Sequence, residues 1–148
     1  MKKQDIITLI ELLKKHYPDA TCSLDFTTPF ELVVAVMLSA QCTDERVNKT
    51  TPELFARCKT IQDFADIDIH ELETIIHPCG FYKNKAKNIK LCAKQVLENL
   101  KYEIASELGI QLGADTSSRL NGTVGGEMTR RLVNLGKQYY ANVNNRMK

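Results

Sequence analysis

The sequence predicts an all-α protein whose helices are joined by short connections. Apolar residues recur every three or four positions through most of the 148-residue chain, as on the buried face of a helix. No segment shows the sustained alternation of apolar and polar residues that a half-buried strand requires. A hydrophobic content of 43% and a charged content of 26% are typical of a globular protein. We expect one helical region over residues 1–98 and a second unit over residues 99–148.

The first two helices are marked by their ends. Ile6 and Leu13 share one face of a first helix that must stop before Pro18. Thr28 is suited to cap a second helix over residues 30–40. Because this second helix is apolar nearly all round, it is expected at the buried centre of the domain.

Shorter helices follow. Thr43 or Asp44 could cap a third helix that runs towards Cys58. Two further helices are expected at residues 61–65 and 69–76, before Pro78 and Gly80 break the chain.

The last third of the chain is expected to hold two helices around a glycine-rich loop. A long helix should start near Tyr82 and stop at Gly109. Residues 109–126 are rich in glycine and predict a flexible loop. A final helix is expected over residues 127–140. Its apolar stripe comprises Met128, Leu132, Leu135 and Tyr139.

Basic residues gather in two places although the net charge is only +2. Such clusters favour polyanions such as nucleic acid or anionic lipid, and they equally fit the solvated surface of a helix. The second cluster lies after Ser118, where all charged residues but one are basic. The first cluster comprises Lys83, Lys85, Lys87, Lys90 and Lys94.

The cysteines are expected to be reduced thiols. The five cysteines are widely spaced, and no pair has the spacing of a zinc or iron–sulfur site. The sequence therefore predicts no metal and no cofactor. The N-terminus lacks the features of a signal peptide, and the apolar stretch at residues 32–38 is too short to span a bilayer. We expect a cytoplasmic protein without a membrane partner.

Polar and aromatic side chains mark two predicted turns. Gln41 follows the buried helix, and Phe81 lies at a glycine turn ahead of a lysine-rich helix start. An apolar side chain on a turn can enter a base step of DNA while lysines hold the backbone. The alternative is that Phe81 belongs to the core and the lysines are solvated.

Residues 1–98 resemble the N-terminal half of endonuclease III, a base-excision DNA glycosylase with lyase activity. The resemblance rests on residues 29–32, 38–41 and 81–89, which read Pro-Phe-Glu-Leu, Leu-Ser-Ala-Gln and Phe-Tyr-Lys-Asn-Lys-Ala-Lys-Asn-Ile. It implies that Gln41 fills the gap left by a flipped base and that Phe81 enters from the other side. Cys42 departs from a more usual alanine.

The resemblance also implies that catalytic parts are missing. That family's helix–hairpin–helix supplies a lysine nucleophile, and the nearest match, residues 120–129, has Glu127 or Met128 at that place. Without an amine, Schiff-base chemistry has no starting point. The later aspartate is not matched, and no cysteine follows Cys92 to bind a cluster. We therefore expect no catalytic residue, with an active or partner-completed glycosylase as the alternative.

Residues 95–141 resemble the α/β-type small acid-soluble spore proteins. The match rests on residues 101–109, 112–116 and 121–133, the last reading Asn-Gly-Thr-Val-Gly-Gly-Glu-Met-Thr-Arg-Arg-Leu-Val. The resemblance implies two helices that fold on double-stranded DNA and protect it in the nucleoid or spore core. It also implies a second partner, a germination protease that cuts at or near Glu103–Ile104.

Together these features predict a truncated glycosylase-like helical domain followed by a helix–glycine-rich loop–helix DNA-binding segment. The join falls within a helix, at residues 95–101, and the oligomeric state is left open. A fusion without function is a third possibility. The expected DNA contacts are Gln41, Phe81, Asn84, Lys85, Lys87, Arg119, Asn121, Gly125, Gly126, Thr129, Arg130, Arg131 and Lys137.

Overall fold

The computed structural model describes the backbone of residues 3–113 and 116–146, and the side chains of residues 5–113, 116–135 and 137. Residues 114 and 115 and the side chain of Tyr139 lie outside these ranges. Every element in the described part of the chain is a helix, as predicted. The elements are α1 (Lys3–His16), α2 (Pro29–Ser39), α3 (Asp44–Arg57), α4 (Ile61–Asp66), α5 (Ile69–Ile76), the short 3₁₀ helix η1 (His77–Cys79), α6 (Tyr82–Glu107) and α7 (Ser118–Arg146).

Helix α2 begins at a capping box. The hydroxyl of Thr28 accepts a hydrogen bond from the Glu31 amide at 3.1 Å, and a Glu31 carboxylate oxygen accepts one from the Thr28 amide at 3.0 Å. This reciprocal pair satisfies backbone groups that a helix start leaves open. Helix α2 was expected at the buried centre of the domain, and Val34 is fully buried, but Val33 and Val36 are exposed, so one side of the helix faces solvent.

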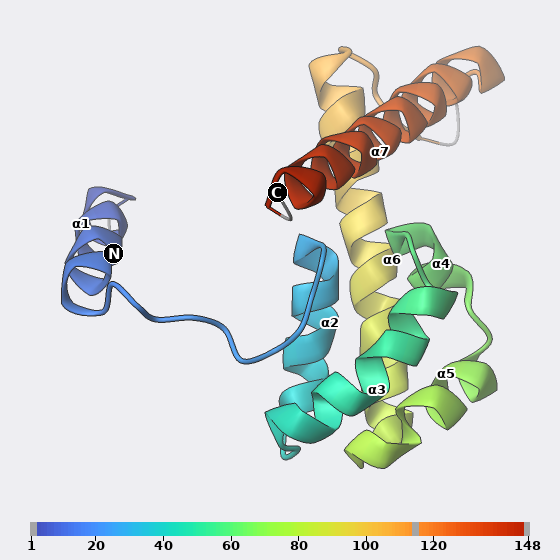
Figure 1. Cartoon of the computed structure of the whole chain (residues 1–148). Coiled ribbons are helices and arrows are strands. Elements are labelled where there is room, and N and C mark those ends of the chain that lie inside the picture. The colour runs from blue at the N-terminus through green and yellow to red at the C-terminus, as the bar shows by residue number, and fades with distance from the viewer. Residues whose placement is uncertain (1–2, 114–115, 147–148) are drawn as a thin grey trace.

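The main core surrounds the N-terminal half of α6, against which α2, α4 and α5 pack, while α3 packs against α2 and α5 (Figure 1). Phe64 of α4 is buried and meets Phe30 and Phe55 edge to face, with ring centroids 5.3 and 6.4 Å away. Aromatic pairs prefer this geometry to direct stacking. The resulting cluster joins the start of α2 to α4 and to the C-terminal part of α3.

Helix α6 runs without interruption through residues 95–101, where the two predicted units join. Its C-terminal half carries a second cluster in which Ile104 and Ala105 pack against Val124 of α7. Gly109 follows the helix with φ of +67°, a left-handed conformation that glycine adopts without steric cost. The predicted end of this helix is therefore confirmed.

The predicted loop over residues 109–126 is wrong in its second half. Helix α7 already begins at Ser118 and contains Gly122, Gly125 and Gly126. Each glycine costs a helix about 1 kcal/mol relative to alanine. Packing outweighs this cost, because Val124 is buried and Met128 and Leu132 pack against the main core. Figure 1 shows α7 crossing the C-terminal half of α6.

Helix α1 stands apart from the other helices, to which residues 17–28 connect it (Figure 1). Its amphipathic pattern is the predicted one, but all its described side chains are exposed. The amphipathic face is therefore not used to build the core described here. None of the described helices combines the length and apolar character that crossing a lipid bilayer requires.

Candidate nucleic-acid interface

Two strained turns face each other at the edge of the main core. Gln41 has φ of +53° and Phe81 has φ of +47°, and among the described residues these are the non-glycine positions with positive φ. Such a conformation costs a non-glycine residue about 1–2 kcal/mol. Strain of this kind persists where the surroundings impose it, and it clusters at functional sites.

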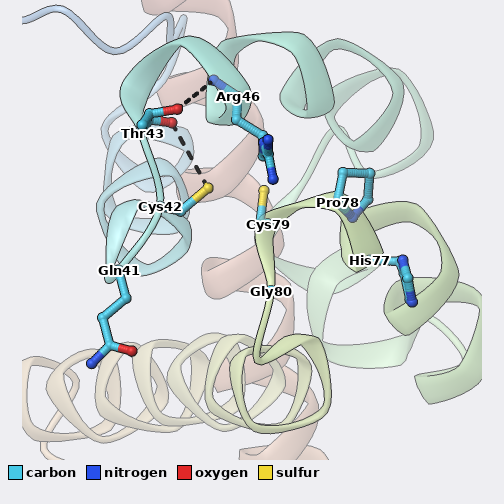
Figure 2. Close-up of a pocket in the computed structure, with 8 residues that line it drawn as sticks. All are labelled: Gln41, Cys42, Thr43, Arg46, His77, Pro78, Cys79 and Gly80. Atoms are coloured by element: carbon cyan, nitrogen blue, oxygen red, sulfur yellow. Dashed lines mark hydrogen bonds between the residues drawn. The ribbon is translucent and has the colours of Figure 1, made fainter.

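A cavity of about 560 Å³ separates the two turns. Figure 2 shows the loop of Gln41 on one side of this cavity and Gly80 on the other. The side chain of Phe81, the residue after Gly80, is 67% exposed and is not part of the core. The structure therefore places an amide side chain and an aromatic ring at neighbouring turns, both accessible from solvent. The cavity is lined by Gln41, Cys42, Thr43, Arg46, His77, Pro78, Cys79 and Gly80.

Lys85 links the two turns through hydrogen bonds made inside the fold. Its Nζ donates hydrogen bonds of 2.8 Å to the carbonyl oxygens of Leu38, at the end of α2, and Cys79, before the second turn. The side chain is only 7% exposed. The expectation of a phosphate contact at Lys85 is therefore corrected, because its charge faces two backbone carbonyls inside the fold.

The other polar residues near the start of α6 divide into two groups. Lys90 is also turned inward, where Nζ donates to the carbonyl of Ala65 at 2.9 Å and to that of Ile67. Asn84 and Lys87 are exposed on the first turns of α6, close to Phe81 in the sequence. These two remain available for contacts with a polyanion.

The arginines of α7 are already paired with acids. Arg131 forms ion pairs with Glu107 of α6 and, at 2.9 Å, with Glu127. Arg130 lies 2.7 Å from Glu127 as well. Hydrogen bonds from Arg130 and Arg131 lower the pKa of the Glu127 carboxyl from 4.5 to about 2. A phosphate would have to displace these carboxylates, whereas Arg119 and Lys137 are exposed.

The glycines expected to approach a phosphate lie inside α7. Gly125 and Gly126 are therefore remote from the free amides of the helix N-terminus, which lies at Ser118. An added Cβ at either glycine would meet no atom within 4 Å. Thr129 donates through its hydroxyl to the Gly125 carbonyl at 3.0 Å, and Asn121 donates to the Thr116 carbonyl at 3.3 Å. Packing within this chain does not explain these glycines.

The expected protease site lies within a packed helix. Glu103 and Ile104 lie within α6, and Ile104 is fully buried against Val124. A peptide bond in a helix cannot adopt the extended form that a protease binds until the helix opens locally. Cleavage here therefore depends on separating α6 from α7.

The nearest match to a catalytic hairpin does not form one. Residues 120–129 belong to a single helix, and Glu127 forms the ion pairs given above. Within the residues that the structure describes, no group of three His, Cys, Asp or Glu side chains could hold a metal.

The described part of the chain has the fold of an all-helical, glycosylase-like domain. Residues 34–141 match the family described as HhH-GPD superfamily base excision DNA repair protein, and the chain belongs to this family. It is 49% identical to endonuclease III from Synechocystis over 107 residues, which are 72% of this chain and 49% of that protein. The chain thus spans about half the length of the endonuclease III relatives that it matches.

A solved structure and a second family extend the comparison. The structure described as a non-covalent endonuclease III–DNA complex superposes with a TM-score of 0.54 and 35% identity, over 85% of this chain and 61% of the other. A separate segment of 46 residues is 61% identical to small acid-soluble spore protein C4 from Priestia megaterium, covering 31% of this chain and 67% of that protein. Both predicted resemblances are thereby confirmed.

Proposed function

We propose that this chain binds double-stranded DNA with little sequence preference and does not cleave it. The observation that carries the proposal is the pair of left-handed turns that present Gln41 and Phe81 on either side of one cavity. An exposed aromatic ring there can enter a base step, while Asn84 and Lys87 lie close enough in sequence to hold the backbone. The similarity to an endonuclease III that was solved with DNA supports this use of the turns.

The C-terminal unit, residues 99–148, would supply a second contact of the spore DNA-protecting type. Its similarity to spore protein C4 supports this assignment, as do the exposed basic residues Arg119 and Lys137. Arg130 and Arg131 would join them by exchanging carboxylate partners for phosphates. Gly125 and Gly126 would allow the α7 backbone to approach the duplex closely, and Thr129 and Asn121 would contribute polar contacts. Such a protein would reside at the nucleoid or in the spore core.

The test is fluorescence anisotropy of the chain on an undamaged duplex of about 20 base pairs at two salt concentrations. Phe81→Ala is expected to weaken binding about tenfold, because a base–aromatic contact contributes roughly 1–3 kcal/mol. Tyr17→Ala is the matched control, since Tyr17 is 66% exposed and lies away from the cavity. Equal losses from both variants would contradict the role of Phe81.

The C-terminal contact has its own test. Arg130→Ala combined with Arg131→Ala should weaken binding and make it less sensitive to salt, because fewer counterions are released. Unchanged binding would remove this face from the proposal. No binding of the unaltered chain at low salt would favour instead a fusion product without function.

A second candidate is a glycosylase or lyase, which membership of the base-excision repair family favours. The site does not support this candidate. Glu127, which is ion-paired, or Met128 occupies the position where the family has its lysine nucleophile. Borohydride trapping on a duplex with an abasic site decides the matter. A covalent adduct would establish lyase chemistry, and its absence at full DNA occupancy supports a binding protein.

A further inference from the structure

Two cysteines from distant parts of the chain meet at the cavity between the turns. Cys42 directly follows Gln41, and Cys79 directly precedes Gly80. Both line the cavity, and the Cys42 thiol is close enough to contribute to the raised pKa of the Cys79 thiol. Figure 2 shows both sulfur atoms directed into the space between the two loops. Both are free thiols in this structure.

The two thiols differ in environment. Cys79 is 2% exposed, and burial raises the pKa of its thiol, although Thr50 contributes a hydrogen bond that acts in the opposite direction. Cys42 is half-buried, and its sulfur lies 3.8 Å from the carbonyl oxygen of Thr43. A cysteine reacts as its thiolate, which must be accessible to the oxidant. Because Cys42 is more exposed than Cys79, Cys42 is the better placed to react first.

We propose that Cys42 and Cys79 are a peroxide-reactive dithiol that closes to a disulfide across the cavity. The Cys42 thiolate attacks one oxygen of a hydroperoxide, which forms Cys42 sulfenic acid and releases hydroxide or alkoxide. The Cys79 sulfur then attacks the sulfenic sulfur, forming the S–S bond and releasing water. Both thiols are oxidised by the removal of two electrons in total, and the hydroperoxide is reduced to water, or to water and an alcohol.

The cross-link has a defined structural consequence. Each cysteine is adjacent to a residue with positive φ, so the S–S bond would add a covalent link between the two turns to the hydrogen bonds that Lys85 makes. The oxidised chain would therefore hold the two turns at a fixed spacing. This inference does not depend on DNA binding, and it is read out without DNA.

The experiment treats the purified full chain with a stoichiometric amount of hydrogen peroxide and maps its peptides by mass spectrometry without reduction. The expected product is a peptide pair joined through Cys42 and Cys79 that has lost two hydrogen atoms. Closing this loop should raise Tm by about 5–10 °C, and dithiothreitol should reverse the shift. Amide hydrogen exchange at residues 41–43 and 79–82 should slow on oxidation.

Two variants separate this site from general cysteine oxidation. Cys42→Ala should abolish both the cross-linked peptide and the Tm shift, whereas Cys22→Ser, at an exposed thiol outside the cavity, should leave both intact. The proposal is overturned if peroxide converts Cys42 to sulfinic acid without a cross-link. It is also overturned if Cys42 pairs mainly with Cys22 or Cys92, or with another molecule.

Discussion

Lys85 on α6 donates a hydrogen bond of 2.8 Å from its Nζ to the carbonyl oxygen of Leu38, at the end of α2. The residues lie far apart in the sequence, and the bond is buried. The same ammonium group donates to the Cys79 carbonyl. One lysine thus links the two turns that present Gln41 and Phe81.

Lys85→Met should destabilise the fold. Methionine retains the apolar stem but removes a charged donor from two buried carbonyl groups, and the expected loss is about 2–4 kcal/mol in the free energy of unfolding. Urea unfolding followed by circular dichroism measures it. Lys87→Met, at an exposed position on the same helix, should change stability by less than about 0.5 kcal/mol. Equal unfolding midpoints for the two variants would contradict the assigned role of Lys85.

Alanine at the glycines of α7 should stabilise the chain and weaken DNA binding. Gly125 and Gly126 are helical with open space around them, so each change to alanine should add about 0.5–1 kcal/mol to the free energy of unfolding. Thermal unfolding measures this gain. If backbone approach to the duplex requires these glycines, the stabilised variants should bind duplex less tightly.

Gly109 is the control of opposite sign for this series. Its φ of +67° is unfavourable for alanine, so Gly109→Ala should lower stability by about 1–2 kcal/mol. If residues 109–126 formed a loop instead, Gly125→Ala and Gly126→Ala would not stabilise the chain. An absence of stabilisation would therefore contradict the placement of these glycines inside α7.

Glu127 should make the packing of α7 depend on pH. Arg130 and Arg131 lower the pKa of this carboxyl from 4.5 to about 2 in the folded chain. A lowered pKa means that the carboxylate stabilises the fold above its unfolded pKa, and that this contribution is lost as pH falls from about 4.5 to about 2. The Tm of the unaltered chain should therefore exceed that of Glu127→Gln at neutral pH.

This difference in Tm should shrink as pH falls towards 2, where about half of the Glu127 carboxyl groups in the folded chain are protonated. Glu98→Gln, at an exposed position of α6, is the matched control and should show a smaller dependence on pH. Glu127→Gln should also raise duplex affinity at low salt, because it releases Arg130 from a carboxylate partner. A Tm difference that is as large at pH 2 as at neutral pH would show that Glu127 acts through packing rather than charge.

Cleavage after Glu103 should require opening of the α6–α7 pair. Because Ile104 is fully buried, a glutamate-specific protease should cut there slowly in buffer and faster as urea approaches the unfolding midpoint. Mass spectrometry of the fragments over time measures the rate at this bond. Rapid cleavage without urea, at the rate of an unfolded peptide, would mean that the pair is open in solution.

Much of the helical architecture was predictable from the sequence because its signals are local. The cap at Thr28 and the stop at Gly109 involve groups within a few residues of each other, and periodicity placed α5 at the observed residues. The turns of Gln41 and Phe81 were also identified in advance. Their left-handed backbone and shared cavity were not, because they depend on how α2 meets α6.

The sequence by itself determined the helical class, most helix ends and the two resemblances. Only the tertiary structure decided where α7 begins, because burial of Val124 against Ile104 outweighs the local preference of glycine for a loop. It also turned Lys85 and Lys90 inward and placed Cys42 and Cys79 at one cavity. The physical reason is common to all three: each arrangement joins residues distant in sequence, so its free energy exists only after the helices have packed.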